Sequence, residues 1–230
     1  MKQIITRGIV LSRTDYGEAD RILTLLTPDQ GKLRLMARGV RKPKSRLAGG
    51  IELFSTADIT FIRGRGEIGT LISARLIKYY STIVQDIDRV QLGYELIKIL
   101  NRATEDHPEA EYFDLLEQTF AALDEPNLNA ELINLWFYAQ MLHHGGSAPD
   151  LHADAAGEKL DATAKYSLDP QEMRLNKDAN GRFSADHIKF LRLCFGYNRP
   201  QALQRVTSAK NLAHDCLAPI RLAAQAHIKT

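Results

Sequence analysis

The residues that could do chemistry are concentrated in one basic run. Seven of the fifteen residues from Lys32 to Arg46 are Lys or Arg and none is acidic, although the chain has a formal charge of only +2. Residues 1–80 carry 15 Lys/Arg against 7 Asp/Glu, and the other 150 carry 15 against 21. Concentrated positive charge repels itself unless a polyanion relieves it, and nucleic-acid phosphate is the commonest soluble polyanion. The run predicts phosphate binding; the alternative is a solvated basic face without a partner.

A second pattern, Gly64-Arg-Gly66-Glu-Ile-Gly69, matches the G-x-G-x-x-G string of dinucleotide sites. Such a site needs a helix that begins there, because its first N–H groups and its dipole hold the pyrophosphate. A period-two pattern typical of a strand follows instead. We therefore interpret the segment as a hairpin turn whose glycines adopt positive φ, with Arg63 and Arg65 on or beside it.

Three histidines could suggest a metal site, since His143, His144 and His152 lie near Asp150 and Asp154. Zinc sites usually combine a Cys or His pair with a second pair downstream, and that second pair is missing. We interpret the histidines as helix-end and loop residues. The chain also has no nucleophile elbow, P-loop or His-Glu-x-x-His. We therefore expect no metal, no cofactor and no catalytic residue, and hence no enzyme.

Composition favours a protein of the reducing cytoplasm. Two cysteines, Cys194 and Cys216, cannot make a disulfide scaffold and are expected in the core. Charges interrupt the N-terminus too early for the apolar run of a signal peptide. Residues 132–149 lack Asp, Glu, Lys and Arg but are too polar for a membrane span, so they predict a buried helix and no membrane association.

The basic run must be positioned by strands, because the pattern before residue 80 has period two. In residues 32–38 the basic side chains Lys32, Arg34 and Arg38 share one strand face and apolar side chains share the other. Turn-forming residues separate five such segments, at 4–13, 19–26, 32–38, 57–62 and 70–77. This predicts a five-stranded OB-type Greek-key barrel over residues 1–80, with an SH3-like barrel as the competitor.

After residue 80 the spacing becomes helical, which predicts an α-helical domain over 81–230 and an α+β fold for the chain. Helices are expected over 83–100, 112–123, 128–142, 184–197 and 207–228, with apolar stripes in the core. Pro219 should kink or divide the last of them. An irregular insertion near 147–182 is expected to hold a small hairpin at 165–175.

The run Gly31-Lys-Leu-Arg-Leu-Met-Ala-Arg-Gly-Val-Arg-Lys-Pro-Lys-Ser-Arg46-Leu-Ala-Gly49 resembles the bacterial recombination-mediator family RecO. The resemblance also rests on Tyr16-Gly-Glu-Ala-Asp-Arg21, on Leu53-Phe54 and on the Arg63 hairpin. It is strong over residues 1–80 and continues less specifically through the helical part and its Tyr197-Asn-Arg-Pro200 turn. It implies an N-terminal OB domain, a helical C-terminal domain and a non-enzymatic, nucleoid-associated role in DNA repair.

The resemblance also implies partners. Members bind single- and double-stranded DNA, anneal complementary strands, partner with RecR, and help RecA replace single-stranded DNA-binding protein (SSB), whose C-terminal tail is a contact. Many relatives carry two Cys-x-x-Cys pairs in the segment corresponding to about 151–183. This chain has none there, so the family's zinc site is not carried over.

The predicted DNA surface has a strand-borne and a loop-borne part. The first 80 residues contain only five aromatics and alternation buries some of them, so phosphate contacts should outweigh base stacking. Neutralised strands repel each other less and keep their base-pairing edges free, as annealing requires. The predicted residues are Lys32, Arg34 and Arg38 on the strand, Arg41, Lys42, Lys44 and Arg46 on the loop, and Arg65 as a weaker addition.

Two other classes of function fit the same residues. Basic loops do not by themselves distinguish DNA from RNA, so an RNA-binding or ribosome-associated OB protein is one alternative. An assembly adaptor whose basic loop meets an acidic protein surface is the other.

Overall fold

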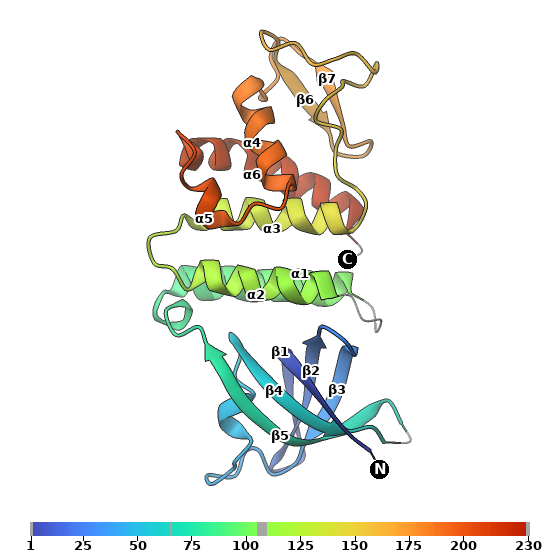
Figure 1. Cartoon of the computed structure of the whole chain (residues 1–230), viewed down its shortest axis with the longest axis vertical. Coiled ribbons are helices and arrows are strands. Elements are labelled where there is room, and N and C mark those ends of the chain that lie inside the picture. The colour runs from blue at the N-terminus through green and yellow to red at the C-terminus, as the bar shows by residue number, and fades with distance from the viewer. Residues whose placement is uncertain (1, 65, 105–109, 229–230) are drawn as a thin grey trace. The chain divides into compact units, whose positions relative to one another are not determined.

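A computed structural model describes residues 2–64, 66–104 and 110–228. The chain divides into two compact units, Met1–Asp124 and Glu125–Thr230 (Figure 1). The strands lead into helices after residue 79, as expected, but two helices belong to the same compact unit as the strands. A domain boundary at residue 80 therefore stays a prediction. Within the described residues, no helix is long and apolar enough to cross a membrane.

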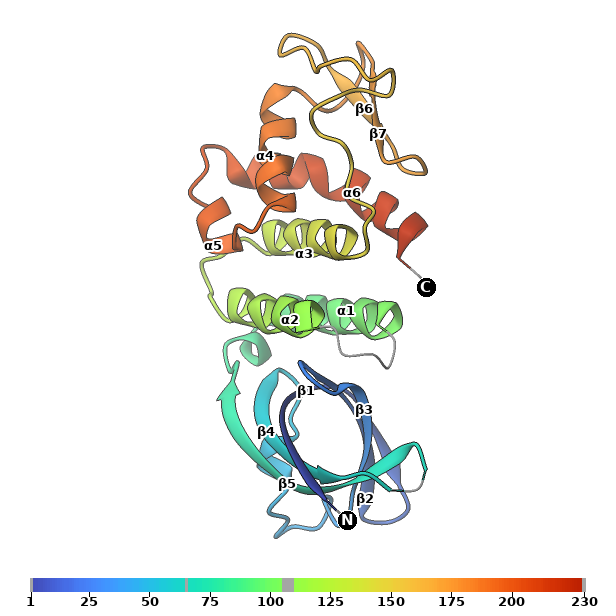
Figure 2. The ribbon, with the colours of Figure 1, turned by 45° about the vertical axis from the view of Figure 1, so that its right-hand side comes forward.

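Five strands form a closed barrel in the order β1-β2-β3-β5-β4 (Figure 2). Their neighbours pair antiparallel except β3 and β5, which run parallel. This is the OB-type arrangement, and it confirms the predicted α+β fold. The strands are β1 (Gln3–Tyr16), β2 (Asp20–Thr27), β3 (Gly31–Ala37), β4 (Ser55–Ile62) and β5 (Ile68–Tyr79).

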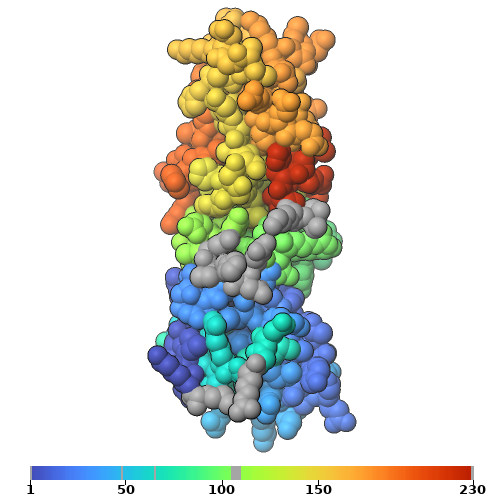
Figure 3. Space-filling model, turned by 90° about the vertical axis from the view of Figure 1, so that its right-hand side faces the viewer, coloured from blue at the N-terminus to red at the C-terminus, as the bar shows by residue number. Residues whose placement is uncertain are grey.

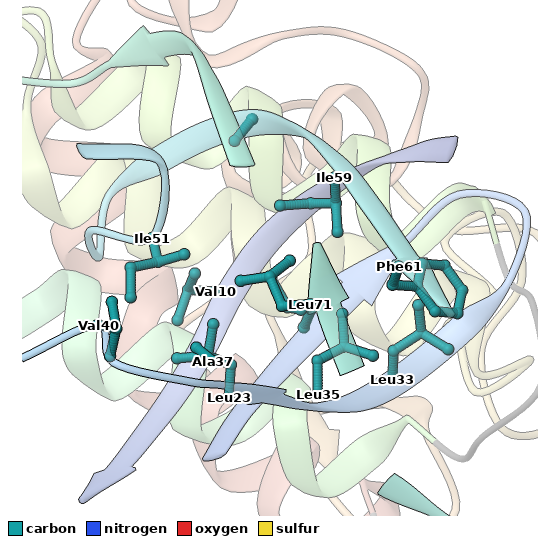
Figure 4. Packing of buried hydrophobic residues seen from close by; sticks show 12 residues of the cluster. Val10, Leu23, Leu33, Leu35, Ala37, Val40, Ile51, Ile59, Phe61 and Leu71 are labelled. Atoms are coloured by element: carbon teal, nitrogen blue, oxygen red, sulfur yellow. The ribbon is translucent and has the colours of Figure 1, made fainter. Parts of the chain in front are cut away.

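The barrel interior is filled by inward-facing apolar side chains from all five strands. The segment between β3 and β4 also contributes, because Val40 and Ile51 are 4% and 1% exposed and belong to the same cluster. They lie at one end of the cluster and Leu33 and Phe61 at the other (Figure 4). The segment between β3 and β4 is thus anchored in the barrel core by two side chains.

The predicted hairpin between β4 and β5 is present, and a strand follows it, as expected. The prediction that its glycines adopt positive φ is wrong for Gly64, whose φ is not positive. Position 69 requires glycine for a different reason. A Cβ there would lie 2.8 Å from Leu35 Cδ2 and 2.9 Å from the Ile62 carbonyl oxygen. Close packing of neighbouring strands therefore requires this glycine.

Two helices complete the first unit. They are α1 (Ile87–Ala103) and α2 (Ala110–Leu123), preceded by a 3₁₀ turn, η2 (Ile83–Gln85). The predicted start at residue 83 is corrected, because Asp86 caps α1 by accepting from the amides of residues 88 and 89. The spacing that predicted this helix includes Ile87 and Tyr94, which were expected in the core; both are exposed, so that part of the prediction is wrong. Gly93 lies on the buried face instead, against the Phe54 ring.

The second unit is built around α3 (Ala130–His144), which is buried from Leu132 to Leu142. Around it lie α4 (Ala185–Phe195), α5 (Pro200–Leu203) and α6 (Ala209–His227). The expected hairpin is present as β6 (Tyr166–Asp169) and β7 (Arg174–Lys177).

Pro219 does not divide α6, which is one continuous helix. A proline inside a helix costs about 3 kcal/mol. Residues on both sides of it, among them Cys216 and Ile220, are buried, and α6 packs on α3. This packing offsets the proline. Cys194 is buried as well, so both cysteines lie in the core as expected.

Candidate nucleic-acid interface

The outward face of β3 carries the basic side chains that alternation predicted. Residues 33, 35 and 37 are buried, whereas Arg34 is exposed, and Arg38 is exposed directly after the strand ends. Four residues of extended chain span roughly 13 Å, so these two side chains leave the backbone at separate points along β3 and its end.

Lys32 shares this face but is engaged within its own unit. Its Nζ donates to the carbonyl oxygens of Asn101 and Thr104, at 2.7 and 2.6 Å. These carbonyls end α1, where the helix dipole favours a cation. The structure therefore places the Lys32 ammonium on a helix terminus, unlike its neighbour Arg34.

Methionine at position 32 or at position 34 should separate these two roles. Lys32→Met removes two charge-assisted hydrogen bonds and should lower the free energy of unfolding by about 1–3 kcal/mol. Arg34→Met should leave stability within about 0.5 kcal/mol. It should instead make the slope of log DNA affinity against log salt shallower by about 0.7. Urea unfolding and salt titration measure the two effects, and equal stability of both variants would contradict the assignment of Lys32.

Four exposed cations form the free part of the basic loop, residues 38–47. Within the described residues, none of the four makes an ion pair or a side-chain hydrogen bond. We call them the loop cations: Arg38, Lys42, Lys44 and Arg46. Their charge is therefore available to an external anion.

Arg41 behaves differently from the loop cations. Its Nε lies 3.5 Å from Asp15 Oδ2, and its Nη1 donates to the Gly17 carbonyl at 3.4 Å. Arg21 donates to the same carboxylate at 2.8 Å. That hydrogen bond, followed by the charge of Arg41, holds the pKa of Asp15 below its ordinary value. Asp15 thus stays ionised and partly neutralises Arg41.

The start of the basic loop is fixed to the turn between β1 and β2. The Gly39 amide donates to Asp20 Oδ1 at 2.7 Å, and the Arg41 amide donates to the Ala19 carbonyl at 2.9 Å. Gly39 has φ +65°, a conformation that glycine adopts without strain. The Tyr16–Arg21 segment therefore positions the loop.

The end of the basic loop is fixed to β5 by the 3₁₀ turn η1 (Ala48–Gly50). A Cβ on Gly50 would lie 2.5 Å from the Ala74 carbonyl oxygen, so the two backbones are in close contact. Ile51 then enters the core. Because both ends are fixed, the loop cations are held in one region of the barrel surface.

Arg34 lies at a second location, beside the hairpin between β4 and β5. There it lines a cavity of about 380 Å³ together with Arg63 and Glu67, over apolar side chains that include Phe61. In the space-filling view, the teal hairpin lies against the blue β2 and β3 segments (Figure 3). Arg63 was not among the predicted site residues, although its place beside the turn was a signal. The predicted residue Arg65 lies outside the described residues.

Aromatic side chains contribute little exposed surface to the barrel. Phe54, Phe61 and Tyr80 are buried, and Tyr16 and Tyr79 are exposed. Tyr16 was not among the predicted site residues, yet it precedes the glycine whose carbonyl accepts from Arg41. Phosphate contact therefore remains the expected mode of binding. Within the described part of the barrel, Tyr16 is the one ring beside the basic loop that could stack on a base.

No metal site is formed by the part of the chain that the structure describes, since no three His, Cys, Asp or Glu side chains converge. His143 and His144 end α3, and His152 lies in a bend, as expected. Elemental analysis should find no stoichiometric zinc, and the Tm should not change in chelator, because a structural zinc contributes folding energy. One tightly bound equivalent of zinc would contradict this prediction.

Comparisons with known proteins match both parts of the chain to one family. The family model described as Recombination protein O N terminal matches residues 1–80, and Recombination protein O C terminal matches residues 84–228. A DNA repair protein RecO from Exiguobacterium sibiricum is 34% identical over 162 residues, which are 70% of this chain and 64% of that protein. One from Rubrobacter xylanophilus is 28% identical over 226 residues, 91% of each chain.

The match to the Exiguobacterium relative therefore spans slightly less than two thirds of that protein's length. The two family models, by contrast, cover nearly the whole of this chain, barrel and helices alike. The chain belongs to the RecO family of DNA repair proteins.

Proposed function

We propose that this chain is a non-enzymatic mediator of recombinational repair that binds single- and double-stranded DNA through its barrel. One observation carries the proposal: the loop cations are exposed and unpaired among the described residues, on a loop fixed at both ends. Arg34 continues this surface along β3. Lys32 and Arg41 contact protein acceptors, so we propose smaller contributions from them.

The proposed mechanism is neutralisation of phosphate. The four loop cations and Arg34 would meet phosphate oxygens, which carry no sequence information. Two strands held in this way repel each other less, and their Watson–Crick edges stay free. Complementary strands would therefore anneal faster on the protein than in solution.

Membership of the family supports further partners. We propose that the chain works with RecR, contacts the C-terminal tail of SSB and helps RecA replace SSB on single strands. Its place would then be the cytoplasm, on the nucleoid.

Competition binding tests the class of ligand. A labelled DNA oligonucleotide is displaced by unlabelled DNA, by RNA of the same sequence and by a polyacidic peptide, all at one ionic strength. We expect DNA to compete at the lowest concentration. Stronger competition by RNA would favour an RNA-binding function, and stronger competition by the peptide would favour an adaptor function.

A further inference from the structure

A second basic stretch lies in the other compact unit. Residues 187–214 contain five Lys/Arg and no Asp/Glu. Two of the five are engaged: Lys189 lies 3.3 Å from Asp186, and Arg192 donates to the Leu151 carbonyl at 2.6 and 3.0 Å. The other three are exposed and form no ion pair within the described residues; they are Arg199, Arg205 and Lys210.

An exposed aromatic ring lies within this stretch. Tyr197 is 91% exposed, more than any other large apolar or aromatic side chain that the structure describes. Among the described residues, its ring makes an edge-type contact with His143, with the ring centroids 5.8 Å apart. Most of the ring is therefore in contact with solvent.

The backbone that carries Tyr197 is held by buried side chains of α3. Trp136 Nε1 donates to the Asn198 carbonyl at 2.7 Å. Gln140 Nε2 donates to the carbonyls of Cys194 and Gly196, at 2.7 and 2.8 Å. Because the backbone of this turn is fixed, only the side-chain torsions of Tyr197 must be ordered when a ligand binds the ring.

We propose that Tyr197 stacks on an unpaired base of single-stranded DNA and that the three exposed cations contact the neighbouring phosphates. An aromatic face recognises any base, and a duplex keeps its bases stacked inside, so the ligand is a single strand. Arg199 is the N-cap residue of α5 and Arg205 follows its C-cap residue, so the two cations flank this short helix. Glu125, which accepts from Gln201 Nε2 at 2.8 Å, marks the acidic margin of the site.

This inference rests on the proposed function in taking DNA as the ligand, and it adds a contact outside the barrel. The test measures the affinity of the full chain for a labelled oligothymidine by fluorescence polarisation. Tyr197→Leu keeps bulk but loses the aromatic face, and it should weaken binding about fivefold or more. Tyr197→Phe keeps the ring and should bind within about twofold of wild type.

The phosphate contacts are tested by replacing the three exposed cations with alanine. This variant should make the salt slope shallower by about 2 units, taking about 0.7 per phosphate. An unchanged slope would overturn the phosphate part of the site.

Equal affinity of Tyr197→Leu and wild type would overturn the proposal and leave this surface to a protein ligand. Equal losses in the Leu and Phe variants would overturn stacking, because the hydroxyl would then be the group that matters. A variant with alanine at the loop cations separates this inference from the proposed function. If the loop-cation variant loses affinity and Tyr197→Leu does not, the Tyr197 site is wrong and the barrel site stands. If Tyr197→Leu loses affinity and the loop-cation variant does not, the barrel site is wrong and the Tyr197 site stands.

Discussion

Alanine at all four loop cations is expected to weaken single-stranded DNA binding roughly 100-fold near 0.15 M salt and to make the salt slope shallower by about 3 units. Each cation would release about 0.7 counterion from a single strand, and none is paired within the described residues. The loss should be similar for different sequences, because phosphates are the contacts. Equilibrium titration of oligonucleotides at several salt concentrations measures both quantities.

A matched control removes four charges elsewhere. Exposed Lys/Arg residues on and beside the β6–β7 hairpin serve for this; they are Lys159, Lys165, Arg174 and Lys177. Their replacement changes net charge equally and should alter the slope by less than 1 unit. The free energy of unfolding of both variants should lie within about 1 kcal/mol of the wild-type value, since the side chains are exposed. Equal losses in the two variants would show that net charge, and not the basic loop, governs binding.

Alanine at Gly50 is expected to lower the free energy of unfolding by about 1–3 kcal/mol. Its Cβ would lie 2.5 Å from the Ala74 carbonyl oxygen and 2.6 Å from the carbonyl carbon. Both atoms are backbone atoms of β5, which is paired with β4 around this residue, so they cannot move aside easily. The end of the basic loop should shift, and DNA affinity should fall although no charge is lost.

Gly49→Ala is the control, because a Cβ at Gly49 meets no atom within 4 Å. Neither glycine has a positive φ, so alanine introduces no backbone strain at either position. Chemical denaturation should place Gly49→Ala at or slightly above wild-type stability, since alanine restricts the unfolded chain. Two variants of equal stability would show that η1 is not seated against β5.

Much of the barrel and its basic face could be predicted from local pattern. Period-two alternation identified β3 and placed Arg34 on its outward side, because a strand turns alternate side chains to opposite faces. The basic loop could be predicted from its concentration of Lys and Arg without acidic residues. The roles of Lys32 and Arg41 were not, because their acceptors come from distant parts of the chain: the end of α1 and the turn after β1.

The helices show the same limit. Spacing identified α1, but the face it buries is set by Gly93, where the Phe54 ring approaches the backbone. A glycine has no apolar side chain, so it adds nothing to a hydrophobic stripe. Pro219 likewise suggested a break that tertiary packing overrides. The turn that carries Tyr197 contributes to the family resemblance, but its exposure could not be predicted, because a lone tyrosine occurs on buried and exposed surfaces alike.

Positive charge on the basic loop is proposed to speed the pairing of complementary strands. Three proteins test it in a stopped-flow annealing assay: wild type, the alanine variant of the loop cations, and a variant in which each of their arginines becomes lysine and each lysine becomes arginine. The swapped variant keeps every charge, and a lysine or an arginine can each contact a phosphate.

We expect the swapped variant to anneal complementary strands at close to the wild-type rate. The alanine variant should approach the spontaneous rate at protein concentrations that saturate wild type. If the alanine variant still anneals strands at the wild-type rate under conditions where it no longer binds DNA, neutralisation of phosphate by the basic loop does not drive annealing.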